Sequence, residues 1–208
     1  MKKVIILGAG GFAREVIWLI EEINKKSLKF EILGVISNEE DKKISYLYLG
    51  NDDALESYED KNIGLILAIG SVKIRQRIIK KLNQMKFDFP NIIANDCILG
   101  NHVKLGRGNI ICSHSILTSD ITIGNFNIIN LSCTIGHDVR IKDFNTINPG
   151  SNISGNVYIK NLIEIGTGSK IIQGIVIEEE NVLGAGCVVV KNTEPYSKYV
   201  GVPAKKLT

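Results

Sequence analysis

The residues best suited to chemistry are a histidine and an aspartate that follow one another, His137 and Asp138. A neutral imidazole, whose ordinary pKa is near 6.5, can take a proton from an attacking amine or hydroxyl at neutral pH. A neighbouring carboxylate can hold the proton on the other ring nitrogen, which fixes the tautomer. The pair therefore predicts a general base. From the residue types alone, the competing interpretation is an exposed histidine on a regular surface.

The chain has only two other histidines, His102 and His114. Both stand three residues after an aliphatic position of the repeat described below, whereas His137 stands two residues after one. We interpret His102 as a surface residue. For His114 two interpretations stay open, a surface residue and a substrate contact across a subunit boundary.

An unbroken aliphatic repeat surrounds the His137–Asp138 pair and must position it. From Ile93 to Val189, every sixth residue is Ile, Leu or Val. An α-helix repeats near 3.6 residues and a lone strand near 2, so neither alone gives this period. A fixed short period over a long run indicates one structural unit stacked on itself.

The true period is three times longer, 18 residues. The residue two places before each aliphatic position takes three types in turn. It is Ser or Cys, then aliphatic, then Asn, with Ile163 as the exception in the Asn set. Three short faces per turn predict a triangular coil, with parallel strands between turns and aliphatic side chains in the core. Glycine often follows the aliphatic residue, which we interpret as relief of backbone crowding at the turns.

A smaller unit precedes the repeat. Residues 3–7 predict a buried strand, and residues 8–13 form a G-x-G-x-x-A turn that opens a helix. The glycines let another group approach the backbone, and the helix N-terminus favours an anion, so the turn predicts a phosphate site. The competing interpretation is a turn that only packs helix on sheet. One face of the helix is apolar: Ala13, Val16, Ile17, Ile20 and Ile23.

The rest of this unit predicts a short sheet. Further strands are expected at residues 31–36 and 63–69, with one near 44–49 inside a charged loop, 41–60. A helix is expected from residue 72 to about Gln84, with Ile74, Ile78, Ile79 and Leu82 inward and its basic residues on the solvent face. The second strand ends in Ser37 and Asn38 rather than in an acid that would hold an NAD ribose. We therefore predict a truncated Rossmann-like domain that holds one nucleotide.

Composition narrows the class of protein. The net charge of +3 is dispersed and argues against nucleic acid, and no apolar run reaches the roughly 18 residues of a membrane span. The N-terminus does not resemble a signal peptide, so we expect a cytoplasmic protein. Three of the four cysteines share the Ser column and none has metal-motif spacing, so we expect packing roles and no metal.

The closing Gly-Val-Pro-Ala-Lys segment, the glycine turn and the repeat together carry a resemblance. They are similar to the hexapeptide-repeat sugar acetyltransferases of bacterial surface-glycan pathways, the PglD/NeuD/perosamine acetyltransferase group, over essentially the whole chain. The resemblance implies an α/β domain at residues 1–88 and a left-handed parallel β-helix at 89–208. It also implies a homotrimer with active sites between subunits.

The resemblance implies that acetyl passes from acetyl-coenzyme A to the amino group of a nucleotide-linked amino-dideoxy sugar, with His137 as base and Asp138 as its partner. The acetyl-coenzyme A residues that it implies are Asn130, Gly155, Thr167, Ala185, Gly201, Pro203, Ala204 and Lys205. The substrate residues that it implies are Gly8, Gly10, Gly11, Phe12, Ser37, Asn38, Ala68 and Gly70.

Two departures from the family pattern leave the substrate open. Phe12 and Ala13 stand where many members have His or Gly, and Ser37-Asn38 stand where many have paired acids that read the base. The nucleotide is therefore not fixed among UDP, dTDP, GDP and CMP, and a different acceptor stays open. The alternatives are O-acetylation of a sugar of the sialic-acid type, a structural or nucleotide-binding scaffold and, least favoured, an NAD-linked oxidoreductase.

Overall fold

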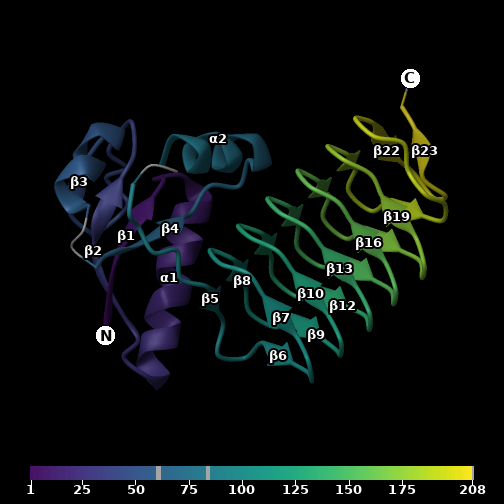
Figure 1. The fold of residues 1–208 in the computed structure, drawn as a ribbon, viewed down its shortest axis with the longest axis horizontal. Helices are drawn as coiled ribbons and strands as arrows, with labels where there is room; N and C mark the ends of the chain where they lie inside the picture. The colour runs from purple at the N-terminus through teal and green to yellow at the C-terminus, as the bar shows by residue number, and fades with distance from the viewer. Residues whose placement is uncertain (60–61, 83–84, 208) are drawn as a thin grey trace. The chain divides into compact units, whose positions relative to one another are not determined.

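The computed structural model describes residues 1–59, 62–82 and 85–207 (Figure 1). The chain divides into two compact units, residues 1–95 and 96–208. The boundary predicted after residue 88 falls earlier in the chain and stays a proposal. Asp60, at the end of the predicted loop, and Gln84, at the end of the predicted helix, lie outside the described residues.

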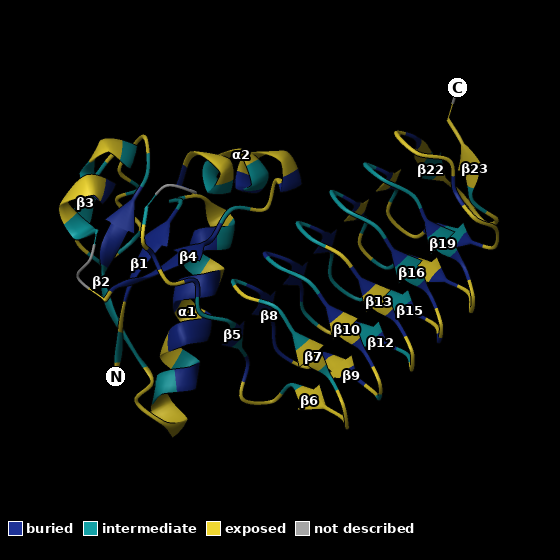
Figure 2. Cartoon of the chain, in the orientation of Figure 1, coloured by how far each residue is buried: buried dark blue, intermediate teal, exposed yellow. Residues whose placement is uncertain are grey.

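The N-terminal unit is built on a four-stranded parallel sheet in the order β3-β2-β1-β4. The strands are β1 (Lys2–Leu7), β2 (Phe30–Ile36), β3 (Tyr48–Gly50) and β4 (Gly64–Leu67). Figure 2 shows β1 and β4 buried along most of their length. The predicted strands are confirmed. The strand predicted near residues 44–49 forms as β3, at the end of that range. A 3₁₀ helix, η1 (Asp52–Tyr58), was not predicted.

Helix α1 (Gly11–Lys26) starts directly after the glycine turn. All five side chains predicted on its apolar face are buried, and Leu19 is buried with them. Gly10 is the N-cap, and its backbone carbonyl accepts from the N–H groups of Ala13 and Arg14. The first turn carries no acidic residue, so the positive end of the helix dipole is not neutralised from within the helix.

The face of helix α2 (Val72–Leu82) differs from the prediction. Arg75 is only 1% exposed, and its Nη1 donates to the carbonyl oxygens of Ile69 and Gly70, both at 2.8 Å. Ile74, predicted to point inward, is 39% exposed. The prediction that every basic residue of α2 faces solvent was therefore wrong. The turn before the helix has carbonyl groups that need donors, and a count of apolar side chains cannot detect that need.

The C-terminal unit is a parallel β-helix made of two-residue strands that form three sheets. We name each sheet after its first strand in this unit. The β6 sheet holds β6 (Ile98–Leu99), β9 (Ile116–Leu117), β12 (Thr134–Ile135), β15 (Asn152–Ile153), β18 (Lys170–Ile171) and β21 (Val188–Val189). The β7 sheet holds β7 (Lys104–Leu105), β10 (Thr122–Ile123), β13 (Arg140–Ile141), β16 (Tyr158–Ile159) and β19 (Val176–Ile177).

The β8 sheet holds β8 (Ile110–Ile111), β11 (Ile128–Ile129), β14 (Thr146–Ile147), β17 (Glu164–Ile165), β20 (Val182–Leu183), β22 (Lys198–Val200) and β23 (Lys205–Lys206). One more short strand, β5 (Ile92–Ile93), closes the N-terminal unit. Paired residues of the coil stand 18 apart, as Thr134 does from Asn152, which confirms the predicted period. The aliphatic positions from Ile111 to Val189 are all buried.

The turns of the coil follow a rule that the sequence did not reveal. Every sixth residue from His102 to Gly186 has a positive φ, three places after the aliphatic position, and most of these residues are not glycine. The glycines directly after the aliphatic position serve close stacking instead. A Cβ at Gly100 would lie 1.8 Å from the backbone oxygen of Thr118. The predicted relief of crowding is confirmed, but it acts between stacked turns of the coil.

Two polar columns connect the turns inside the coil. In the Asn column, the backbone N–H of Asn145 donates to Asn127 Oδ1 at 2.8 Å, and Asn127 N–H donates to Asn109 Oδ1 at 2.9 Å. In the Ser/Cys column, Ser115 Oγ donates to the backbone oxygen of Asn130 at 2.8 Å. These bonds satisfy buried backbone groups that a wholly apolar core would leave unpaired.

Candidate active site

His137 and Asp138 lie at the corner between β12 and β13 and contact each other. The His137 Nδ1 atom is 2.8 Å from Asp138 Oδ2, and both side chains are about half exposed, 54% and 60%. Asp138 has a φ of +59° and donates its backbone N–H to the backbone oxygen of Ser119. With the Nδ1 proton held by the carboxylate, the lone pair lies on Nε2, which is the arrangement of a general base.

Gly155 lies against the ring of His137, one turn further along the coil. A Cβ at Gly155 would lie 2.5 Å from both Cε1 and Nε2 of His137. Real side chains do not approach so closely, so only glycine leaves room for the imidazole in this position. The backbone oxygen of His137 accepts from Asn156 N–H at 2.7 Å, which fixes the spacing of the two turns.

The other two histidines also have carboxylate partners. His102 Nδ1 is 3.0 Å from Asp120 Oδ1, and His114 Nδ1 is 3.2 Å from Asp96 Oδ2. Both histidines are about three-quarters exposed, so the surface prediction is confirmed for His102. An aspartate near the ring does not by itself distinguish His137. A subunit-boundary contact for His114 stays a prediction.

Thr167 and Ala185 lie at the opposite edge of the β6 sheet from His137. They are exposed and stacked, because Gly186 N–H donates to the backbone oxygen of Thr167 at 2.8 Å. Asn130 lies beside the same column of corner residues and is 9% exposed, and its Oδ1 accepts from Leu131 N–H at 2.8 Å. The structure therefore brings together Gly155 with His137, and Thr167 with Ala185, at two edges of one sheet.

The closing segment is bonded to the last strand of the same sheet. Val188 in β21 donates its N–H to the backbone oxygen of Gly201 and accepts from Ala204 N–H at 2.8 Å. Gly201 has a φ of +95°, and Pro203 and Lys205 are exposed. The predicted acetyl-coenzyme A residues thus flank one sheet and its end, where small side chains leave backbone groups accessible.

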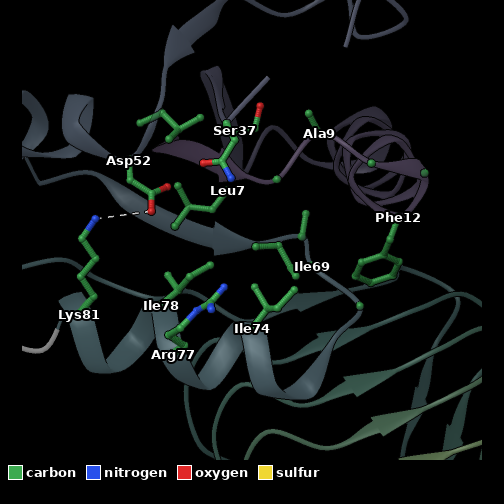
Figure 3. A pocket seen from close by; sticks show the side chains of 17 residues that line it. Leu7, Ala9, Phe12, Ser37, Asp52, Ile69, Ile74, Arg77, Ile78 and Lys81 are labelled. Atoms are coloured by element: carbon green, nitrogen blue, oxygen red, sulfur yellow. Dashed lines mark ion pairs between the residues drawn. The ribbon is translucent and has the colours of Figure 1, made fainter. Parts of the chain in front are cut away.

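A pocket of about 700 Å³ in the N-terminal unit is lined by all eight predicted substrate residues (Figure 3). It opens where β1 and β4 end side by side, with Ala68 N–H donating to the backbone oxygen of Leu7 at 2.9 Å. Gly8, with a φ of +113°, passes close to β4: a Cβ there would lie 2.9 Å from the backbone oxygen of Ala68. This crevice at the carboxyl ends of parallel strands is the usual nucleotide position in such sheets.

Comparison with known proteins agrees with this architecture. Residues 3–82 match the family described as PglD N-terminal domain. Perosamine N-acetyltransferase from Caulobacter crescentus, solved as a histidine-to-asparagine variant with CoA and GDP-perosamine, is 26% identical with a TM-score of 0.92. That alignment covers 100% of this chain and 98% of the other. The chain is thus similar to this acetyltransferase over its whole length and to the PglD N-terminal domain over residues 3–82.

Two further solved structures have the same fold as this chain over 100% of both chains. The acetyltransferase domain of PglB from Neisseria gonorrhoeae is 24% identical with a TM-score of 0.92. WeeI from Acinetobacter baumannii is 24% identical with a TM-score of 0.89. Among proteins with curated descriptions, none matches the chain in sequence.

Sequence reasoning missed part of the pocket in the N-terminal unit. Helix α2 contributes Ile74, Arg77, Ile78 and Lys81, and η1 contributes Asp52. The i, i+3, i+4, i+7 spacing of the four α2 residues is a signal that these side chains share one face of the helix. Ile74 and Ile78 were predicted to lie in the core, and Arg77 and Lys81 were predicted to face solvent. Their place beside the glycine turn follows from the fold alone.

The cysteines have the packing roles that were predicted. Cys112, Cys133 and Cys187 are buried, and burial raises the pKa of the Cys133 thiol to about 11. Burial also raises the pKa of Cys97 to about 11. A thiol with so high a pKa is a poor nucleophile at neutral pH. Within the described residues, no group of three or more His, Cys, Asp or Glu could hold a metal ion.

No described helix has the length and apolar character that a membrane crossing requires.

Proposed function

We propose that this protein is an acetyl-coenzyme A-dependent N-acetyltransferase that acts on the amino group of a nucleotide-linked amino-dideoxy sugar in bacterial surface-glycan synthesis. The observation that carries the proposal is the His137–Asp138 pair seated on Gly155, in a chain that also has a pocket beside the glycine turn. The relative from Caulobacter crescentus binds CoA and GDP-perosamine, and the relative from Neisseria gonorrhoeae binds acetyl-coenzyme A.

The chain's own residues supply the proton transfer. The sugar amine attacks the thioester carbonyl, and His137 Nε2 takes the proton that the amine loses. Asp138 holds Nδ1–H and stabilises the imidazolium that forms. As the tetrahedral intermediate collapses, the carbon–sulfur bond breaks, and the imidazolium returns its proton to the leaving thiolate. This sequence needs neither a covalent acyl-enzyme nor a metal.

We propose that acetyl-coenzyme A lies along the β6 sheet. Asn130 and Gly155 would stand at the thioester end, Thr167 and Ala185 along the pantetheine arm, and the segment 201–205 at the adenine end. Thr167 and Ala185, in the middle of this path, have small and exposed side chains, which fit a long ligand that is held mainly by backbone groups. We further propose a homotrimer with active sites between subunits, working in the cytoplasm.

The test is an acetyl-transfer assay with acetyl-coenzyme A and UDP-, dTDP- or GDP-linked 4-amino-dideoxy sugars, followed by release of the coenzyme A thiol. The proposal predicts thiol release with one nucleotide sugar and a product stable to hydroxylamine, because an amide resists it. A product labile to hydroxylamine is an ester and would favour the O-acetylation alternative. Failure of acetyl-coenzyme A to bind would favour the scaffold alternative.

A further inference from the structure

One face of helix α2 closes the nucleotide pocket opposite the glycine turn. We call it the α2 face: Ile74, Arg77, Ile78 and Lys81. All four line the pocket, and Figure 3 shows their side chains directed into it from the helix. The family resemblance gave none of them a role. Two aliphatic side chains and two cations on one wall suit a ligand with both an apolar and an anionic part.

The rotation of α2 about its axis is fixed by a residue on another face. Arg75 is buried and donates from Nη1 to the backbone oxygens of Ile69 and Gly70. Those two residues line the same pocket. Arg75 thus ties the helix to the turn that precedes it, and Arg77, whose side chain is exposed, lines the pocket from this helix.

The two cations of the α2 face, Arg77 and Lys81, differ in whether an acidic side chain lies beside them. Lys81 Nζ lies 3.6 Å from Asp52 Oδ2, so its charge is partly neutralised before any ligand binds. Arg77 has no ion-pair partner among the described residues. A guanidinium stays charged at every physiological pH and offers a planar fork of N–H donors that matches a phosphate. Arg77 is therefore the residue of this wall best suited to an anionic ligand.

The opposite wall offers a second favourable site for the same anion. Helix α1 begins at Gly11, its N-cap residue Gly10 makes no side-chain capping bond, and its first turn has no acid. The first N–H groups of a helix carry a partial positive charge and bind phosphate. Gly10, Gly11 and Arg77 line one cavity, so a phosphate inside it would lie between two positive walls.

We propose that Arg77 binds the phosphate of the nucleotide sugar from the α2 side, opposite the α1 N-terminus. Lys81, held by Asp52, makes the smaller contribution. This inference rests on the proposed function, because it requires a nucleotide in this pocket. Arg77 would raise the affinity for the substrate through the diphosphate, and this contribution would be the same whichever base the nucleotide carries.

The experiment compares a nucleoside diphosphate with its nucleoside. Titration calorimetry of UDP, dTDP and GDP, and of uridine, thymidine and guanosine, identifies the diphosphate that binds the wild-type protein most tightly. Arg77→Gln is expected to raise the Kd of that diphosphate by about tenfold to a hundredfold, the scale of a charge-assisted hydrogen bond. The Kd of the matching nucleoside is expected to stay nearly unchanged. Arg77→Lys keeps the positive charge but lacks the planar fork of donors. Its Kd for the diphosphate is expected to lie between those of the wild-type protein and Arg77→Gln.

The matched control is Lys80→Gln, which removes the same charge from an exposed position of α2 outside the pocket. It is expected to leave both affinities unchanged. Diphosphate binding by Arg77→Gln at wild-type strength would overturn the inference and leave the proposed function standing. An equal loss for the nucleoside and the diphosphate would also overturn it. A wild-type protein that binds none of these ligands would contradict both the inference and the proposed function.

Discussion

The imidazole of His137 occupies the space that a side chain at Gly155 would need: a methyl group at Gly155 would lie 2.5 Å from Cε1 and from Nε2 of the ring. The backbone of one turn is thus the surface on which the proposed base of the neighbouring turn rests. Because Gly155 is not among the positive-φ residues, its requirement for glycine is steric.

Gly155→Ala should therefore displace the ring without straining the backbone. We expect kcat to fall by about tenfold to a thousandfold, because small misplacements of a catalytic group are costly, while the melting temperature changes little. Ser154→Ala, at the exposed neighbouring position, is the control and should keep full activity. Wild-type kcat in a folded Gly155→Ala protein would show that the ring position does not matter.

Asp138→Asn tests the charge of the partner without altering its shape. Asparagine tolerates the positive φ of this position and can still accept from Nδ1–H. Loss of the negative charge should lower kcat by about tenfold to a hundredfold, the scale of a charge-assisted hydrogen bond. Asp120→Asn is the matched control: Asp120 stands one turn below, has a φ of +57° and pairs with His102. Equal losses in the two variants would refute a special role for Asp138.

Cys133 should tolerate serine better than alanine. Its Sγ donates to the backbone oxygen of Asn148 at 3.3 Å, and Ser115 makes the equivalent bond to Asn130 in the turn below. We expect Cys133→Ser to be nearly neutral and Cys133→Ala to cost about 1 kcal/mol, measured by chemical denaturation. Equal stabilities would mean that the column selects only for size.

The raised pKa of Cys133 also predicts a pH dependence. Burial raises the pKa of its thiol to about 11 in the fold, from an ordinary value of 9.0. Since the unfolded chain ionises first, the protection of the thiol is complete below pH 9 and is lost as the pH rises toward 11. Between these limits the wild-type protein should lose on the order of 2 kcal/mol more stability than Cys133→Ser. Parallel pH profiles for the two proteins would contradict this assignment.

Asn127 supports two turns of the coil at once. Its Oδ1 accepts from Asn145 N–H, and its Nδ2 donates to Asn109 Oδ1 at 3.1 Å. Asn127→Ala leaves the buried N–H of Asn145 without this partner and removes one of the two bonds to Asn109 Oδ1, so we expect a loss of about 1 to 3 kcal/mol in the free energy of unfolding. Asn156→Ala, at an exposed corner, should cost much less. Comparable losses would show that the column is not structural.

The period of the aliphatic residues was sufficient to predict the coil, since a strict period leaves one stacking arrangement that buries every member. Gly155 was predicted only through the family resemblance, as a residue of the acetyl-coenzyme A path, and only the coordinates show the ring of His137 resting on it. Arg75 shows the limit of the approach. Its burial depends on carbonyl groups of a turn, which no pattern of side chains reports. Arg77 lines the pocket from the same helix, and the side-chain pattern did not predict that position either.

The general-base role of His137 is tested by comparing kcat/KM for acetyl transfer to the accepted nucleotide amino sugar between the wild-type protein and His137→Ala. We expect kcat/KM to fall by about two to four decades in a His137→Ala protein that melts as the wild-type protein does and still binds acetyl-coenzyme A. A folded His137→Ala protein with a kcat/KM near that of the wild type would contradict the role of His137 as general base.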